Sequence, residues 1–275
     1  MLKGTSASML ESFLFILYNA VLIMTTKELD SYFRELLNID AFKEIDASMN
    51  GLQVDNDGRK IKKVAFAVDA SLGVFNRAHE RGADFLFTHH GLFWKKPLML
   101  VGPHYKRIEF LIRNNLALYA CHLPLDAHPL YGNNAGIATK IGLEDRKSFA
   151  ILGKRNIGIM GVIEETSIDD ILQILFSKGD MPSHVLPFGT NRIRKIAILS
   201  GSGATFVDEA IEKGVDLYIT GEIKHETYNK ALEAHLNVIA GGHYNTETYG
   251  VELVKEKLEC DFDIETCFIN LPTGL

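Results

Sequence analysis

The chain has 275 residues, of which 47% are hydrophobic and 23% charged, and its formal net charge is −6 at pH 7. These values are ordinary for a globular protein of one large domain or two modest ones. The acidic balance excludes a general basic surface, so we do not expect nucleic acid as a partner. The three cysteines, Cys121, Cys260 and Cys267, show no CxxC spacing, which indicates a reduced, cytoplasmic protein.

The N-terminal region contains an apolar run at residues 13–24, FLFILYNAVLIM. The run is shorter than the roughly 20 residues of a membrane-spanning helix, so we expect no membrane association. We favour an extension outside the folded core for residues 1–23; a signal peptide and an additional helix are the alternatives. Thr25 and Glu28 then form a capping-box motif at the start of an amphipathic helix, so the first domain is expected to begin at Met24.

An internal repeat organises the rest of the chain. Residues 63–88 align without a gap with 195–220, and after a change of offset 115–127 align with 235–247. Each copy has the pattern strand, helix, strand, helix, strand, which is typical of a parallel sheet covered by helices. The predicted class is therefore α/β, with two pseudo-repeated βαβαβ units in two lobes and the functional site in the cleft between them.

The repeat also predicts how the chain is divided. We expect a first α/β half at 24–128, a middle segment at 129–190 that belongs to the second lobe, and a second half at 191–275 whose C-terminal end packs back toward the first. The middle segment contains a strand pattern at 156–163 and a helix that begins near Ser167. The Asn pair of YGNNAG, at 131–136, is typical of a turn.

Polar side chains follow corresponding strands in both copies. In open parallel sheets, ligands bind beyond the carboxyl ends of the strands. His89 and His90 follow the second strand of the first copy, and Glu222 and His225 lie after its counterpart. The third strands are followed by His122, Asp126 and, marginally, His128 in the first copy, and by His243 and Glu247 in the second.

These residue types indicate a metal site. Imidazole and carboxylate groups are the ligands of divalent ions such as zinc, iron, manganese or cobalt. His243 and Glu247 are one helical turn apart, whereas His89 and His90 point in opposite directions on extended backbone. Two ions that flank the strand end would use both histidines, with a carboxylate of Asp126 or Glu247 as the bridge.

Together these motifs resemble the NIF-three-like family, also called the GTP cyclohydrolase I type 2 family. The matching elements are NGLQV (50–54), ADFLFTHHGLFW (83–94), CHLPLDAH (121–128), GEIKHE (221–226) and GGHYNTE (241–247), in family order over about residues 24–275. The resemblance implies a dinuclear centre held by His89, His90, Asp126, His243 and Glu247. It also implies a homohexameric ring and hydrolytic opening of the GTP imidazole ring.

The leading hypothesis is a hydrolase that uses two divalent metal ions per subunit on a nucleotide or a related phosphorylated substrate. His122, Glu222 and His225 are assigned to proton transfer or to orienting ligands at the rim. Trp94, Lys95 and Lys96 are candidates to meet an anionic, planar substrate; the alternative is an oligomer contact or a cover over the sheet.

Two other functions stay open at this point. The protein could be a non-catalytic metal-binding scaffold, with a regulatory or adaptor role, in which the ions hold the halves together. Coordination closed entirely by protein groups would favour that interpretation, and an open position would favour an enzyme. A two-metal enzyme that processes nucleic acid is the third hypothesis, and the acidic charge argues against it.

Overall fold

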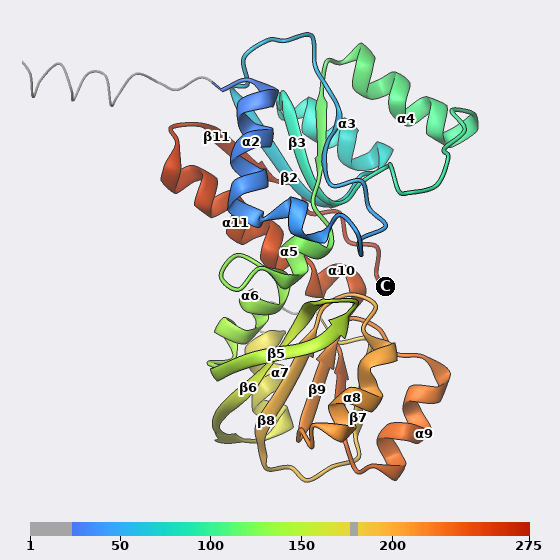
Figure 1. Ribbon diagram of the computed structural model, residues 1–275, viewed down its shortest axis with the longest axis vertical. Coiled ribbons are helices and arrows are strands. Elements are labelled where there is room, and N and C mark those ends of the chain that lie inside the picture. Colours follow the sequence, from blue (N-terminus) through green and yellow to red (C-terminus); the bar gives the residue numbers. More distant parts are fainter. Residues whose placement is uncertain (1–23, 177–180) are drawn as a thin grey trace, which may run out of the picture.

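The protein is built from two α/β lobes, which lie one above the other in Figure 1. This computed structural model describes residues 24–176 and 181–275, so the interpretation of residues 1–23 lies outside the described residues. Each lobe has one sheet with helices on both faces. The predicted α/β class is confirmed, and each copy of the repeat supplies the central parallel strands of one sheet.

The first lobe contains a five-stranded sheet of order β1-β4-β3-β2-β11. All its strands are parallel except β1, which pairs antiparallel with β4. The strands are β1 (Gly51–Val54), β2 (Lys63–Asp69), β3 (Phe85–His90), β4 (Ala117–Ala120) and β11 (Glu265–Phe268), and the helices are α2 (Thr26–Leu37), the 3₁₀ turn η1 (Ile39–Phe42), α3 (Leu72–Glu80), α4 (Gly102–Arg113) and α11 (Thr248–Asp261).

Apolar side chains on both faces of the first sheet explain its buried position between helix layers. Phe66 of β2 belongs to the core that α2 and α11 cover, whereas its neighbour Ala67 belongs to the core under α3 and α4. The small alanine side chains of β2 leave room for Phe75 of α3. The period-two alternation of the strand therefore fills two separate cores.

The second lobe contains a six-stranded sheet of order β5-β6-β8-β9-β10-β7, in which β8, β9 and β10 are parallel and the remaining pairs antiparallel. Its strands are β5 (Glu144–Leu152), β6 (Arg155–Thr166), β7 (His184–Pro187), β8 (Ile193–Leu199), β9 (Leu217–Thr220) and β10 (Asn237–Ala240). Its helices are α7 (Ile168–Leu175), the 3₁₀ turn η2 (Ala204–Phe206), α8 (Val207–Glu212) and α9 (His225–Glu233).

The second sheet repeats the packing of the first. Ala197 of β8 packs in the core with α8 and α9, as the equivalent Ala65 packs with α3 and α4. Ile196 and Ile198 face the opposite core, which α7 covers. Matching faces of the two copies are thus covered by matching helices, which is the structural basis of the repeat.

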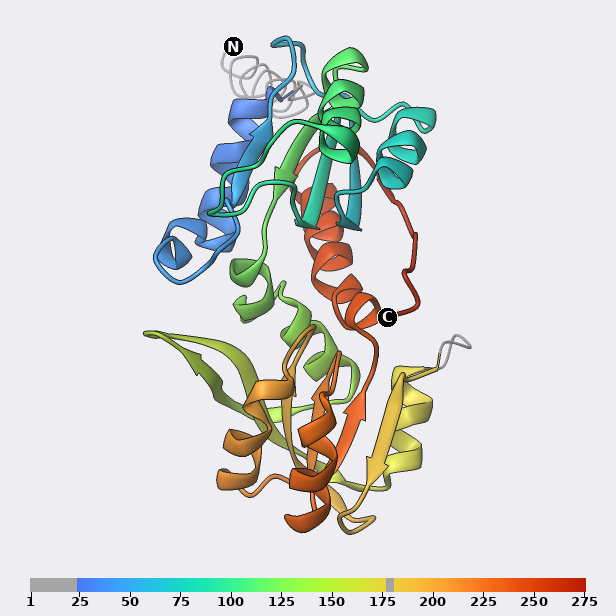
Figure 2. The ribbon, with the colours of Figure 1, turned by 90° about the vertical axis from the view of Figure 1, so that its right-hand side faces the viewer.

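Four helices occupy the region between the lobes. The chain passes from the first lobe to the second through α5 (Leu123–Ala127) and α6 (Asn133–Lys140), and it returns through α10 (His243–Thr246) and α11. α11 packs against α6, and β11 then pairs in parallel with β2. Figure 2 shows this return, in red, from the lower lobe into the upper one. The domain boundaries proposed at 128 and 190 stay predictions.

Local sequence signals account for several helix starts. Thr25 accepts a hydrogen bond from the backbone of Glu28, whose carboxylate accepts one from the backbone of Thr25 in return. Ser167 and Asp170 form the same capping box at α7. The helix expected near Ser167 and the strand expected at 156–163 are both present, as α7 and β6.

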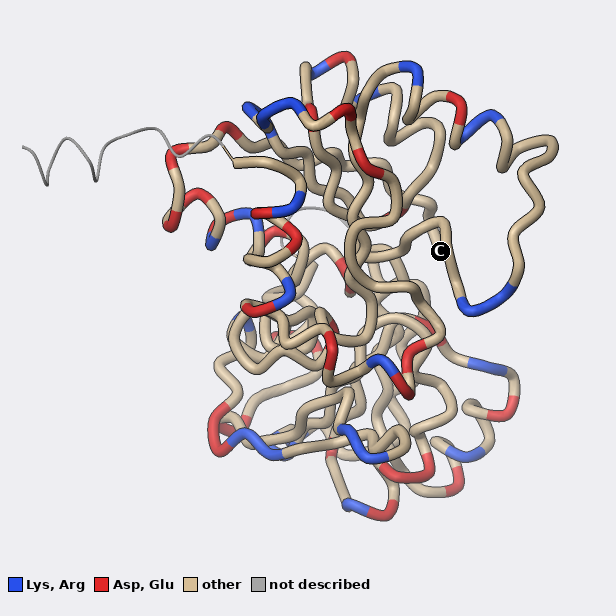
Figure 3. The backbone as a smooth tube through the Cα atoms, turned by 45° about the horizontal axis from the view of Figure 1, so that its top comes forward, with Lys and Arg blue, Asp and Glu red and all other residues tan. Residues whose placement is uncertain are grey.

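Charged residues are interspersed rather than gathered in one region. Figure 3 shows Lys and Arg segments alternating with Asp and Glu segments over both lobes. Within the described residues, no helix has the length and apolar character that crossing a bilayer requires.

Candidate metal centre

Side chains from both lobes converge at the carboxyl ends of β3 and β4 in the first copy and of β10 in the second. His89 and His90 are the last two residues of β3, and their ring centroids are 4.6 Å apart. Asp126 lies on α5, immediately after β4, and is 6% exposed. His243 begins α10 and Glu247 caps it, so one helical turn brings both toward the first lobe.

Glu247 is the centre of this arrangement. One carboxylate oxygen, Oε1, lies 3.4 Å from Nε2 of His89 and 3.1 Å from Nε2 of His243. The other, Oε2, lies 3.3 Å from Nε2 of His90. Nε2 of His89 also lies 3.6 Å from Oδ1 of Asp126. All five predicted ligands therefore meet at one place in the structure.

The opposite nitrogen, Nδ1, of each histidine is held by another group. Nδ1 of His89 is 2.9 Å from the carbonyl oxygen of Cys121, and Nδ1 of His90 is 2.9 Å from Oδ1 of Asp69 on the neighbouring strand β2. These partners turn the two rings toward the same side, so the expectation that neighbouring histidines point apart does not hold at this strand end.

Two further histidines are oriented in the same way. Nδ1 of His243 contacts a carboxylate oxygen of Glu222, and Nδ1 of His122 is 2.9 Å from Oδ1 of buried Asp46. A hydrogen bond at Nδ1 fixes the ring and leaves Nε2 free to bind a metal ion, which is the usual arrangement around protein metal sites.

Asp126 is held by a network of buried side chains. Its Oδ1 accepts hydrogen bonds from Nδ2 of Asn133 at 2.8 Å and from Oγ of Ser200 at 2.9 Å. Asn133 in turn accepts a hydrogen bond from the backbone N–H of Gly250 in α11. The expectation of turn chemistry for the Asn pair is wrong: Asn133 and Asn134 begin α6 and are 0% and 2% exposed.

Gly201 leaves the space that Glu247 occupies. Its φ is +61°, and a Cβ built on it would lie 2.1 Å from Oε1 of Glu247 and 3.3 Å from Nε2 of His243. Any other residue at this position would push the carboxylate away from the histidines. Glycine is required here both for the backbone conformation and for the close approach.

The charges of the cluster favour a cation. Burial opposes protonation of His89, but the carboxylates of Asp126 and Glu247 outweigh it and raise the pKa of His89 to about 10. Burial likewise opposes protonation of His243, and Glu247 with Glu222 raises its pKa to about 9. Burial tends to raise the pKa of Glu247, yet the three facing histidines hold it well below its usual range. The carboxylates thus draw positive charge into the cluster.

The residues present fit a metal ion. Nε2 of His89 and Oε2 of Glu247 are buried and make no hydrogen bond with the described residues. Buried polar atoms without a partner are costly and point to an ion or water that satisfies them. Within the described part of the chain, three sets of donor atoms lie close enough to hold an ion: His89, Asp126 and Glu247; His90, His243 and Glu247; and His89, His90 and His122.

The three residues with predicted catalytic roles lie at different places. His122 belongs to the third of these ligand sets, and its ring lies 5.1 Å from the ring of Trp94, measured between centroids. Glu222 contacts His243 as described above. His225 is an exposed residue at the start of α9, and none of the three sets contains it. The structure therefore brings the first two to the cluster but not His225; their catalytic roles stay predictions.

Sequence reasoning missed four residues that shape the site: Asp46, Asp69, Asn133 and Gly201. Asp69 and Gly201 occupy equivalent positions in the repeat: Asp69 is the last residue of β2, and Gly201 lies just beyond the end of β8. The alignment of the two copies could therefore have identified them. Asp46 lies before the repeat, and its sequence neighbourhood carries no comparable signal.

Comparisons with known proteins identify the family of the chain. Residues 24–273 match the family described as Duf34/NIF3 (NGG1p interacting factor 3). The chain is 42% identical to a protein of Treponema pallidum and 43% identical to one of Archaeoglobus fulgidus, both named GTP cyclohydrolase 1 type 2 homolog. In each case the match covers 92% of this chain and 100% of the relative.

The fold is also found in solved structures. TTHA1606 from Thermus thermophilus is similar with a TM-score of 0.82 and 38% identity, over 92% of this chain and 100% of that one. Reduced HcgD from Methanocaldococcus jannaschii is similar with a TM-score of 0.80 and 30% identity, over 90% and 98% of the two chains. From the sequence match and the shared fold, the chain belongs to the Duf34/NIF3 family.

Proposed function

We propose that the protein is a dinuclear metal-dependent hydrolase that acts on a nucleotide or a related phosphorylated substrate. The observation that carries the proposal is the position of Glu247: its Oε1 lies near His89 and His243, its Oε2 lies near His90, and the residue belongs to two of the candidate ligand sets. A buried carboxylate shared between two ligand sets is the arrangement of a bridging ligand in a two-metal site.

In this proposal His89, Asp126 and Glu247 hold one ion, and His90, His243 and Glu247 hold the other. Two such ions, when bound, supply Lewis acidity and an activated water for hydrolysis. Asp69 and Glu222 keep the rings of His90 and His243 in the tautomer with a free Nε2. His122, whose Nδ1 is fixed by Asp46, presents its other nitrogen beside the cluster, where it binds an ion or carries a proton.

The exposure of the cluster favours an enzyme over a closed structural site. The side chains of His89 and Glu247 are 0% and 3% exposed, whereas those of His90 and His243 are 20% and 27% exposed. One side of the cluster is therefore accessible from solvent. Structural metal sites are usually closed by protein ligands, and catalytic sites keep an open position for water and substrate.

The accessible side is bordered by the loop that follows β3. Trp94 lies there, 6.4 Å from His90 and 5.1 Å from His122 between ring centroids, and the exposed Lys95 and Lys96 follow it. An aromatic ring beside two cationic side chains suits a planar, anionic substrate. GTP ring opening and assembly into a homohexamer are part of the proposal on the strength of the family alone.

The decisive experiment measures metal content and hydrolysis together. His90→Ala should lose bound metal and, in a screen of nucleotides and phosphoesters that includes GTP, all activity of the wild type. His184→Ala, which removes an exposed histidine on β7, is the matched control and should keep both. A His90→Ala protein that lacks metal but hydrolyses its substrate at the wild-type rate would overturn the proposal, as would a metal-loaded wild type inactive on the whole screen.

A further inference from the structure

A cavity lies beside α10, the helix that begins with His243 of the metal centre. Its volume is about 180 Å³, and its walls come from α6, α7 and β9 on one side and from α11 and β11 on the other. Thr246 of α10 and Thr248 of α11 line it, while Glu247 between them faces the histidines. None of the five predicted metal ligands lines this cavity, so it is a separate site.

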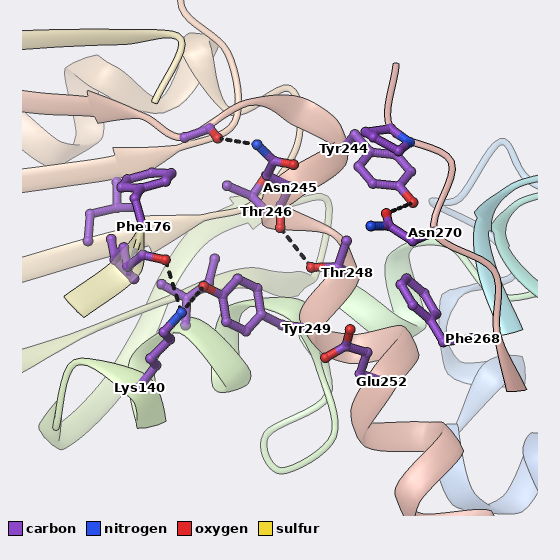
Figure 4. A pocket seen from close by; sticks show the side chains of 15 residues that line it. Lys140, Phe176, Tyr244, Asn245, Thr246, Thr248, Tyr249, Glu252, Phe268 and Asn270 are labelled. Atoms are coloured by element: carbon purple, nitrogen blue, oxygen red, sulfur yellow. Dashed lines mark hydrogen bonds between the residues drawn. The ribbon is translucent and has the colours of Figure 1, made fainter. Parts of the chain in front are cut away.

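Aromatic side chains form much of the wall. Phe176, Tyr244, Tyr249 and Phe268 line the cavity, and Figure 4 shows their rings around a common space. Rings of this kind bind flat ligands by stacking. The volume is below the about 300–1,000 Å³ of sites for drug-sized molecules, so the occupant is a molecule of one or two rings.

Polar groups at the cavity have unused hydrogen-bonding capacity. Glu252, an exposed residue that lines the cavity, makes no hydrogen bond or ion pair within the described part of the chain. Nδ2 of Asn245 donates a hydrogen bond to the carbonyl oxygen of Gly241, and Oδ1 of the same side chain accepts none from the described residues. The cavity therefore offers a carboxylate and an amide oxygen, both acceptors, to a ligand that carries N–H donors.

The same groups disfavour a phosphate. The ammonium of Lys140, the cation that lines the cavity, already donates to the carbonyl of Leu175 and the hydroxyl of Tyr249. A phosphate would also meet the negative charge of Glu252. The cavity therefore favours a ligand with N–H donors over a phosphate.

We propose that the cavity binds a small, planar heteroaromatic molecule that bears an amino group. The ring lies between the aromatic walls, its amino group donates to the carboxylate of Glu252, and its ring N–H donates to Oδ1 of Asn245. This site is independent of the function proposed for the metal centre.

The test titrates the metal-loaded protein with 2-aminopurine, whose fluorescence changes on stacking, and with purine, which lacks the amino group. We expect saturable binding of 2-aminopurine. Glu252→Gln should weaken it about tenfold while purine binding is unchanged, because only the charge-assisted hydrogen bond is lost. Glu256→Gln, one helical turn further along α11, is the matched control and should bind like the wild type.

Two more variants locate the bound ring. Phe268→Leu should weaken the binding of both 2-aminopurine and purine several-fold, because it removes a stacking surface. Thermal melting checks that this variant is folded. His90→Ala should leave 2-aminopurine binding intact, even if it loses metal. The proposal is overturned if 2-aminopurine does not bind up to its solubility limit, if Glu252→Gln and Phe268→Leu both bind like the wild type, or if binding disappears in His90→Ala.

Discussion

The two copies of the repeat place different side chains at equivalent positions around one centre. Position 90 of the first copy is a histidine whose Nε2 faces Glu247, whereas its counterpart, Glu222, orients His243 from behind. Position 69 is an aspartate that orients His90, whereas its counterpart, Gly201, provides space for Glu247. One backbone framework, used twice, thus places a candidate ligand in one copy where the other copy places a residue that orients or accommodates a candidate ligand.

The difference shows that neither copy contains a complete site. The first copy, with the turn after it, contributes His89, His90 and Asp126, and the second contributes His243 and Glu247. The side chains that are not ligands decide the geometry as much as the ligands do. Substitutions at the equivalent positions can therefore separate the two contributions.

The largest effect is expected from Gly201→Ala, which places a Cβ 2.1 Å from Oε1 of Glu247. We expect metal affinity to fall by at least about 100-fold, since the central carboxylate must move. Gly214→Ala is the matched control: its φ of +59° is nearly that of Gly201, but no atom lies within 4 Å of the added Cβ. Competition with a chelator measures the metal affinity of both variants. Equal affinities would show that the contact between the added Cβ and Glu247 does not affect metal binding.

A smaller effect is expected from the two orienting carboxylates. Asp69→Asn and Glu222→Gln keep the size of the side chain but remove the charge that holds Nδ1 of His90 or His243. Each should lower metal affinity about 10–100-fold. Glu226→Gln, on the exposed face of α9, serves as control. If metal affinity fell in only one of the two variants, only that carboxylate would be needed to orient its histidine ring.

Asn133→Ala tests the link between the copies. The substitution leaves the buried N–H of Gly250 without its acceptor and removes one of the two side-chain donors to Oδ1 of Asp126, the other being Ser200. We expect the free energy of unfolding to fall by about 1–3 kcal/mol, measured by urea denaturation, with a loss of metal affinity below about tenfold. Asn76→Ala, on α3, removes an exposed amide that bonds only within its own helix and should change neither quantity. An Asn133→Ala protein with the same free energy of unfolding as the wild type would show that this network does not contribute to stability.

The smallest effect is expected from His225→Ala. The side chain is exposed and belongs to none of the ligand sets formed by the described residues. Metal affinity should stay within about twofold of the wild-type value, as for other exposed positions. A larger fall in a chelator titration would mean that α9 contributes to the centre, and the second copy would then supply as many ligands as the first.

Much of the fold follows from patterns that are local in the sequence. Apolar runs bounded by glycine and charge identify the six repeated strands, and capping boxes locate α2 and α7. The meeting of the five candidate ligands could be predicted because parallel strands end at one edge of a sheet and the two copies of the pattern mark that edge twice.

The remaining features depend on contacts between distant segments. Asp46 meets His122 across the first lobe, and Asn133 meets Gly250 of α11. An asparagine pair after glycine has the same sequence signature whether it makes a surface turn or a buried network, so only packing distinguishes the two. Likewise, His225 and His243 both follow strands, and the direction of the following helix decides which one reaches the centre.

The return of α11 and β11 to the first lobe has a consequence for biosynthesis. β2 finds its neighbour β11 only after the whole second lobe has left the ribosome, since residues 248–268 follow it in the chain. Until then one side of the first sheet is an unpaired edge, open to association with other nascent chains. Binding of a metal ion that uses His243 and Glu247 likewise awaits synthesis of the second lobe.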